Sequence, residues 1–186
     1  MANQVLLLAA SLYFYACWNP LYLCLIVFSV LATWWGGLAL ENKTVKQKRI
    51  VVALVIFVNL MILFFFKYYD FALDNINRIL SFAGAGTIRR KFDVLLPVGI
   101  SFYTFQALGY LLDVYWNRIR AQRNFFRFAL FTSFFPQLSQ GPISRYADLS
   151  VTLYQEHKFD WKQVRFGLER ILWGYFKKLV VADRIA

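Results

Sequence analysis

Apolar residues in this chain gather into long runs that are separated by short polar or basic stretches. Five runs are expected to lie in a membrane, at residues 5–18, 21–40, 50–69, 94–115 and 124–138. A helix needs about 20 mostly apolar residues to cross a hydrocarbon core of roughly 30 Å. The first run is slightly short, and Asn19-Pro20 closes it in the way typical of one helix ending and the next beginning.

Two further segments alternate apolar and polar residues at helical spacing. Residues 70–83 and residues 160–185 show this pattern, which predicts amphipathic helices that lie at the membrane interface or pack on a larger bundle. The pattern as a whole predicts an all-α fold, a polytopic transmembrane helical bundle with interfacial amphipathic helices. The sequence shows neither an internal repeat nor a soluble domain boundary, so residues 1–186 are expected to form a single membrane domain.

The run 94–115 is unusual because strongly polar residues lie inside it. Gln106 falls in mid-span, where an amide needs partners from neighbouring helices or from water. Asp113 lies near the end, shortly before three arginines, and a buried aspartate at the bilayer centre would cost about 2.5 to 3.5 kcal/mol. We expect Gln106 to join helices or to line a site, and Asp113 to form an ion pair or to line a substrate path.

Two features precede this run. Asp93 is expected to cap its helix, with Pro97 in or near the first turn, where a missing N–H does least harm. The motif Gly84-Ala85-Gly86-Thr87 suggests a phosphate-binding loop, but it has neither the preceding strand nor the lysine that such a loop needs. A flexible turn is therefore the favoured interpretation.

Composition strengthens the membrane interpretation. The chain is 60% hydrophobic and only 17% charged, which is more apolar surface than a soluble core of this size buries. The net charge of +11 comes mainly from residues beside the apolar runs, so lipid headgroups are the expected partner and nucleic acid is not. The loops at 41–49 and 117–123 hold seven Lys or Arg together, which predicts a shared cytoplasmic side that also holds the N-terminus.

Few residues offer chemistry. His157, the only histidine, lies beside Glu156, but no cysteine or serine is placed to be its nucleophile. A surface role is therefore favoured for His157, and no metal site is expected because it has no second histidine at helical spacing. The polar stretch 136–148 contains Arg145, which could hold loop carbonyls, a headgroup phosphate or an anionic donor. Non-helical backbone at membrane depth is tolerated only in protein or beside a wet cavity.

Three ordered blocks carry a resemblance to a known family. They read LLPVGISFYTFQALGYLLDVYW, NFFRFALFTSFFPQLSQGPISRY and GYFKKLVVADRIA. In this order they resemble the N-terminal half of membrane-bound O-acyltransferases of the alginate O-acetyltransferase and D-alanyl-transfer type. The resemblance extends more loosely to LLLAASLYFYACW and FFFKYYDFALDNIN, so it covers nearly the whole chain.

The resemblance implies a multi-pass enzyme of the cytoplasmic membrane. Such an enzyme passes an acyl group from a cytoplasmic thioester, acetyl-CoA or another acyl thioester, to a hydroxyl at or beyond the outer face. Polysaccharide acetylation is the usual role of relatives with this pattern. No bound cofactor is implied. The implied partners are the lipid bilayer and the acyl donor, with a separate extracytoplasmic acyltransferase or carrier protein as an optional partner.

The resemblance also bears on the site. The family's catalytic histidine lies in its later half, so it is expected beyond Ala186, and His157 does not match it. Scaffold or tunnel-wall positions are implied for Gln106, Asp113, Gln137, Gly141, Pro142 and Arg145. We therefore expect a fragment that lacks a competent active site by itself. The alternatives are a non-enzymatic small polytopic scaffold or partner protein and, less favoured because no repeated halves appear, a transporter.

Overall fold

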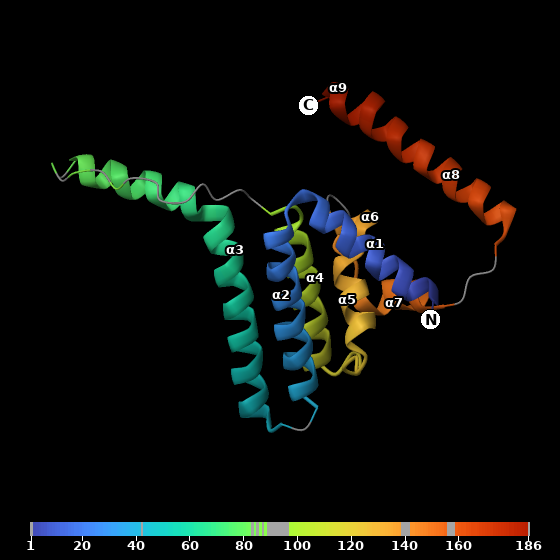
Figure 1. Ribbon diagram of the computed structural model, residues 1–186, viewed down its shortest axis with the longest axis horizontal. Coiled ribbons are helices and arrows are strands. Elements are labelled where there is room, and N and C mark those ends of the chain that lie inside the picture. Colours follow the sequence, from blue (N-terminus) through green and yellow to red (C-terminus); the bar gives the residue numbers. More distant parts are fainter. Residues whose placement is uncertain are drawn as a thin grey trace. The chain divides into compact units, whose positions relative to one another are not determined.

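The computed structural model describes residues 2–41, 43–82, 84, 86, 88, 97–138, 142–155 and 159–185, with no description of the Ala2 and Trp18 side chains. All regular structure among these residues is helical, as the apolar pattern predicts (Figure 1). The chain divides into two compact units, Met1–Tyr154 and Gln155–Ala186, and each is described by itself.

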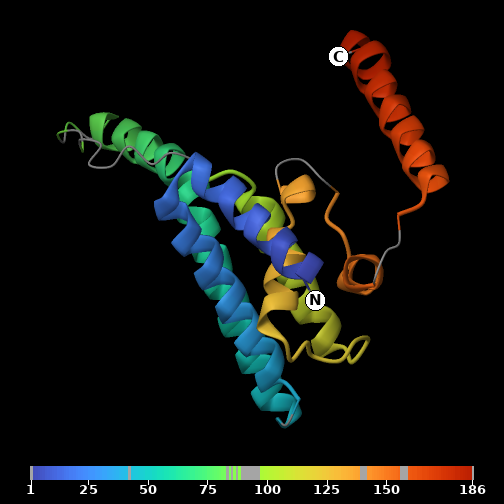
Figure 2. The same cartoon turned by 45° about the vertical axis from the view of Figure 1, so that its right-hand side comes forward.

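The described part of the first unit is built from helices of very different length. Their bounds are α1 (Ala2–Trp18), α2 (Pro20–Ala39), α3 (Val45–Phe82), α4 (Ile100–Tyr115), α5 (Phe125–Ser133), α6 (Phe135–Leu138) and α7 (Tyr146–Tyr154). Helix α3 runs antiparallel to both α2 and α4, so α2 and α4 pack together in the same direction (Figure 1). Helix α1 packs across α2 and α5 (Figure 2).

Helices α2 and α3 are both long and apolar enough to cross a membrane. Helix α2 begins where the sequence predicts, because the Asn19 side-chain oxygen accepts a hydrogen bond of 2.9 Å from the Leu21 N–H. Pro20 occupies the first helical position, where no N–H is needed. The expected break at Asn19-Pro20 is thus confirmed, and it lets α1 and α2 run in different directions.

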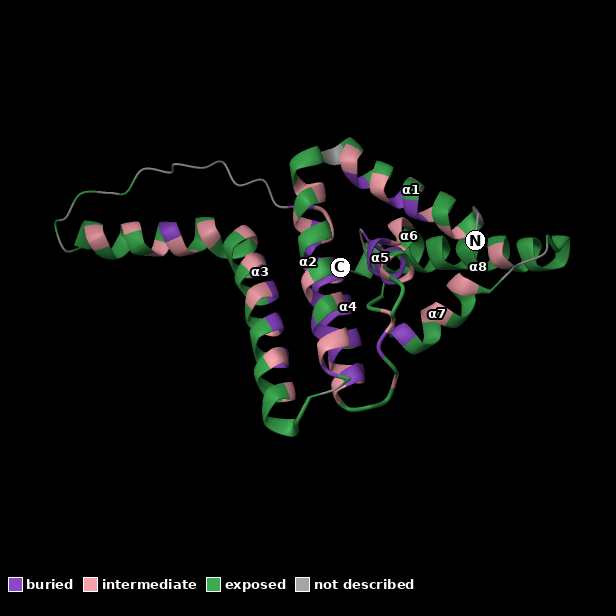
Figure 3. Cartoon of the chain, turned by 60° about the horizontal axis from the view of Figure 1, so that its bottom comes forward, coloured by how far each residue is buried: buried purple, intermediate pink, exposed green. Residues whose placement is uncertain are grey.

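Helix α4 is the central helix of the first unit. Nine of its 16 residues are buried, and buried positions also follow the sides of α2 and α3 that face it (Figure 3). Close packing depends on small residues: a Cβ at Gly36 would meet the Val55 side chain at 2.7 Å, and one at Gly37 would meet the Tyr110 ring at 3.1 Å. These contacts bring α2 against α3 and α4.

The boundary expected at residue 70 is wrong. Residues 50–69 and 70–83 are predicted as two helices, whereas α3 is one helix of 38 residues, Val45–Phe82. The sequence between Phe66 and Asp74 contains neither proline nor glycine, so nothing interrupts its backbone hydrogen bonds. Figure 1 shows the helix changing direction along its length while remaining helical.

The expected helix 94–115 is shorter than predicted. Helix α4 begins only at Ile100, and its 16 residues give a length of about 24 Å. Gly99 precedes it with a positive φ of 70°, and a Cβ at that position would collide with the backbone carbonyl of Leu138. Pro97 therefore lies before the helix, and its carbonyl accepts a 3.3 Å bond from Ile100 N. Asp93 lies outside the described residues.

The expected span 124–138 is also wrong as a single helix. It is divided into α5 and the four-residue α6, with Phe134 in an extended conformation between them (ψ 106°). Pro136 explains the division, because a proline lacks an N–H and its ring clashes with the carbonyl four residues earlier. The same residue fits comfortably in the first turn of α6.

The second unit has the long helix predicted for residues 160–185. It consists of α8 (Trp161–Phe176), a π-helical turn η1 (Lys177–Ala182) and α9 (Asp183–Ile185). Asp160 caps α8 by accepting a 2.9 Å bond from Lys162 N. No described residue of this unit, taken by itself, is buried, so both faces of the amphipathic helix lack a covering partner within the unit.

Candidate functional site

One face of α4 carries the polar residues of the candidate site. Gln106, Gly109, Tyr110 and Asp113 are spaced three, four and seven residues apart, which puts them on one side of a helix. These four residues line a pocket of about 260 Å³. The opposite wall is formed by residues 143–145, which precede α7, so the pocket joins two of the three sequence blocks.

Three residues predicted from the sequence meet in this pocket. Gln106, Asp113 and Arg145 all line it, although Arg145 is more than 30 residues further along the chain. The complete lining is Gln106, Gly109, Tyr110, Leu112, Asp113, Trp116, Arg118, Ile143, Ser144 and Arg145. Gly109 keeps the wall open, because no atom lies within 4 Å of where its Cβ would be.

Gln106 is fixed by the break between α5 and α6. Its side-chain Nε2 donates a 3.2 Å hydrogen bond to the Phe131 carbonyl of α5. In an uninterrupted helix the N–H of Phe135 would bond to that carbonyl, but Phe135 N instead donates to Ser11 Oγ of α1 at 3.3 Å. Gln106 thus satisfies a carbonyl that the break between α5 and α6 leaves free. Its amide oxygen has no partner among the described residues and is available to the pocket.

Asp113 forms the expected ion pair. Its Oδ1 lies 3.4 Å from Nη1 of Arg118, and 14% of its side chain is exposed against 58% for Arg118. The guanidinium also lies 4.8 Å from the centre of the Trp116 indole ring. Arg118 is held between a carboxylate and an aromatic face, so the loop after α4 has a defined position over the pocket.

The wall opposite α4 is anchored by a chain of aromatic and polar contacts. Tyr146, the first residue of α7, meets the Tyr110 ring edge to face with centroids 5.0 Å apart, and its hydroxyl accepts a 2.7 Å hydrogen bond from Gln122 Nε2. At the far end of α7 the Tyr154 hydroxyl donates to the Arg127 carbonyl at 2.6 Å. Burial raises the pKa of Tyr154 well above its ordinary value, so this hydroxyl stays protonated and remains a donor.

The charges in the pocket favour binding over catalysis. Asp113 neutralises Arg118, which leaves the exposed Arg145 as a cation without an ion-pair partner among the described residues. The lining contains neither histidine nor cysteine, and Ser144 has only a long 3.5 Å contact to the Pro142 carbonyl. The pocket can therefore hold a polar or anionic group, and it offers no activated nucleophile.

The remaining predicted residues lie elsewhere. Gln137 is on α6, and its buried Oε1 has no hydrogen-bond partner among the described residues. Pro142 is exposed in the stretch before α7 and does not line the pocket. Gly141 and His157 lie outside the described residues. Among the described residues no group of three His, Cys, Asp or Glu side chains is placed to hold a metal ion.

Several lining residues were not singled out as site residues from the sequence. Tyr110 shares the helical face of Gln106 and Asp113, so the spacing of three, four and seven residues contained a usable signal. Ile143 and Ser144 had no such signal, because their place depends on how the stretch before α7 folds back onto α4.

Comparison with known proteins finds relatives by sequence. No family model matches the chain, and no solved structure matches it. Curated proteins do match. A probable alginate O-acetylase from Pseudomonas putida is 36% identical over 186 residues, 99% of this chain and 38% of that protein. Its counterpart from Pseudomonas aeruginosa is 34% identical over 188 residues, 99% of this chain and 35% of that protein.

A third relative has a different name. A peptidoglycan O-acetyltransferase from Helicobacter pylori is 32% identical over 207 residues, covering 97% of this chain and 38% of that protein. The chain spans little more than a third of the length of these curated relatives.

Two apolar helices of membrane-spanning length, α2 and α3, pack against α4, and α4 carries the polar pocket. Over almost its entire length the chain is similar to curated proteins named for O-acetyl transfer, and its three ordered sequence blocks agree with that similarity.

Proposed function

We propose that this chain is part of a membrane-bound O-acyltransferase that acetylates a cell-envelope polysaccharide. The observation that carries the proposal is the similarity over 97 to 99% of the chain to proteins named for O-acetylation of alginate or peptidoglycan. Both named acceptors are polysaccharide-containing polymers that offer hydroxyl groups. The proposed reaction therefore moves an acetyl group from a thioester to a sugar hydroxyl, with release of the thiol.

The pocket on α4 is proposed as part of the wall of the substrate path. Gln106 offers an amide oxygen, and Arg145 offers a guanidinium that has no ion-pair partner among the described residues. These groups can orient a polar substrate by hydrogen bonds. No histidine lines the pocket, and its one carboxylate, Asp113, is paired with Arg118. We therefore propose that a histidine in the part of the relatives that this chain does not span takes the proton from the acceptor hydroxyl.

The donor and partners follow from the same proposal. Acetyl-CoA or another acyl thioester would reach the enzyme from the cytoplasm, and no residue described here would hold a bound cofactor. A separate extracytoplasmic acyltransferase or carrier protein could then take the acetyl group onward to the polymer. We also propose that the first unit is a multi-pass bundle in the cytoplasmic membrane, with the apolar faces of α2 and α3 toward lipid.

A chimera tests the function. This chain would replace the matching segment of the Pseudomonas aeruginosa relative in a strain that lacks the native gene, and the acetyl content of its alginate would be measured by proton NMR. We expect acetylation to return, since the chain aligns with that protein over 188 residues. A chimera present in the membrane at the normal amount but without acetylation would contradict the proposal and favour a scaffold role.

A labelling experiment tests the topology. Lys46→Cys reports on the end of α3 beside the loop 41–49, and Phe82→Cys reports on the opposite end. Both variants are made in a chain in which Cys17 and Cys24 are changed to serine, and they are labelled in intact spheroplasts. A membrane-impermeant maleimide should label the exposed Phe82→Cys position and should label Lys46→Cys only after lysis. Labelling of Lys46→Cys in intact spheroplasts would reverse the proposed orientation.

A further inference from the structure

A second, larger pocket lies where the two basic loops meet. Its volume is about 470 Å³, within the usual range for ligand pockets. It is located where α2 ends, α3 begins and α4 ends. The lining residues are Leu40, Glu41, Lys48, Val114, Asn117, Arg118, Ile119, Arg120 and Ala121.

The pocket has an apolar floor and a cationic rim. Leu40, Val114 and Ala121 are buried and form the apolar part. The rim carries three cations, Lys48, Arg118 and Arg120, and a single acid, Glu41. A ligand that fits this arrangement has a negative charge beside an apolar portion.

The single acid does not neutralise the rim. The Glu41 carboxylate lies 3.4 Å from Nη2 of Arg123, a residue outside the lining, and this ion pair ties the two loops together. Among the described residues neither Lys48 nor Arg120 has an ion-pair partner, and Lys48 is half-buried. Two unpaired cations therefore border one cavity, which favours an anion there.

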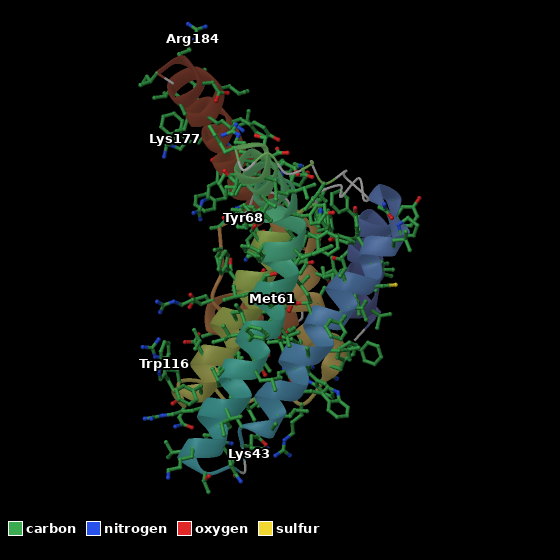
Figure 4. All side chains as sticks on the ribbon, turned by 90° about the vertical axis from the view of Figure 1, so that its left-hand side faces the viewer. Lys43, Met61, Tyr68, Trp116, Lys177 and Arg184 are labelled. Atoms are coloured by element: carbon green, nitrogen blue, oxygen red, sulfur yellow. The ribbon has the colours of Figure 1, made fainter. Side chains whose placement is uncertain are left out.

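Aromatic residues place this end of the bundle at the level of the lipid headgroups. Trp116 and Trp35 are 53% and 69% exposed, and indole rings are enriched at membrane–water interfaces. Trp34 lies in the same region, where its indole Nε1 donates a 2.7 Å hydrogen bond to the Gln122 carbonyl. Figure 4 shows Trp116 and Lys43 at one end of α3 and α4, and Tyr68 toward the other.

We propose that this pocket binds the phosphodiester headgroup of an anionic phospholipid. Lys48, Arg118 and Arg120 would donate hydrogen bonds to the phosphate oxygens, and the glycerol backbone would lie against Val114 and Leu40. Arg118 also lines the α4 pocket, but Lys48, Arg120 and the apolar floor have no part in the proposed acyl-transfer reaction. Acetylation by the chimera therefore does not decide it.

The test measures lipid binding by the whole 186-residue chain in detergent micelles. Native mass spectrometry would compare added phosphatidylglycerol with phosphatidylcholine, for the unchanged chain and for the double variant Lys48→Gln with Arg120→Gln. The matched control is Lys43→Gln with Lys46→Gln, which removes the same charge from exposed positions of the same region that do not line the pocket. Circular dichroism confirms that each variant keeps its helices.

We expect phosphatidylglycerol to bind more tightly than phosphatidylcholine. The affinity of the pocket variant for phosphatidylglycerol should be about 25-fold lower than that of the unchanged chain, because each lost cation contributes about fivefold. The affinity of the control variant should change less than about threefold. Equal losses in both variants would show diffuse attraction and overturn the proposal. Pyrophosphate would also be tested in lipid-free micelles. If the unchanged chain bound pyrophosphate, the pocket variant did not, and the chain showed no preference between the two lipids, the lipid assignment would be overturned in favour of a soluble phosphate ligand.

Discussion

The hydroxyl of Ser29 on α2 donates a hydrogen bond to the amide oxygen of Asn59 on α3. Both residues are only 1% exposed. The same amide donates to its own helix at Val55 O, 2.9 Å away, and to Thr33 Oγ1 at 3.4 Å. Apolar side chains pack against lipid almost as well as against each other. This polar cluster therefore specifies which faces of α2 and α3 meet.

Removing the amide should loosen the helix pair. We expect Asn59→Ala to lower the free energy of unfolding by about 1 to 2 kcal/mol, because Ser29 and Thr33 lose a buried partner. Unfolding in mixed micelles of increasing dodecyl sulfate, followed by tryptophan fluorescence, measures this change. Asn75→Ala is the control, since the only partner of that half-buried amide among the described residues is Phe71 O of its own helix. Equal losses in the two variants would contradict a register role for Asn59.

Gly99 should tolerate no side chain. Its φ of 70° strains any L-residue, and a Cβ would collide with the Leu138 carbonyl. We expect Gly99→Ala to destabilise the first unit by about 2 kcal/mol or more in the same unfolding assay. Gly109→Ala is the matched control, because its Cβ would meet no atom within 4 Å. A Gly99→Ala variant as stable as this control would show that α4 begins differently.

Gly109 offers a way to close the α4 pocket without disturbing the core. Alanine fits the open space at this position, so we expect Gly109→Ala to keep acetylation by the chimera within about twofold. Gly109→Phe should fill the pocket of about 260 Å³ and reduce acetylation at least tenfold, with normal membrane levels. Acetyl content by proton NMR reports both results. Full activity of the phenylalanine variant would exclude this pocket from the substrate path.

Gln106 should affect both folding and acyl transfer. Gln106→Leu leaves the buried Phe131 carbonyl without its donor and should cost about 1 to 2 kcal/mol of stability. It also removes the amide oxygen from the pocket, so acetylation by the chimera should fall further than the amount of folded protein does. Gln163→Leu makes the same change at an exposed position of the second unit. Unchanged stability and activity in Gln106→Leu would show that Gln106 contributes to neither folding nor acyl transfer.

Local signals in the sequence predicted local structure well. Asn19 caps α2 as its position suggests, because capping depends on residues only two or three positions away. The Asp113–Arg118 pair spans five residues and was also foreseeable. The all-helical class follows from long apolar runs, which leave few other ways to satisfy backbone hydrogen bonds.

The misplaced boundaries have a different origin. Apolar content continues through Pro136, so the pattern alone suggests one span where the backbone must break. At residue 70 the opposite happens: the pattern becomes amphipathic while the backbone stays helical. The contact of Gln106 with Phe131 O could not be predicted, since it depends on which carbonyl the break between α5 and α6 leaves free and on how α4 meets α5.

Arg118 belongs to the lining of both pockets. One guanidinium therefore serves two compartments, and an anion that binds it from the loop side competes with Asp113 for the same positive charge. Thermodynamic linkage makes such competition reciprocal: the factor by which the Asp113–Arg118 pair lowers the affinity for the anion is the factor by which the bound anion weakens the pair. In the proposed lipid complex, the composition of the surrounding membrane would therefore adjust the charge on the wall of the α4 pocket.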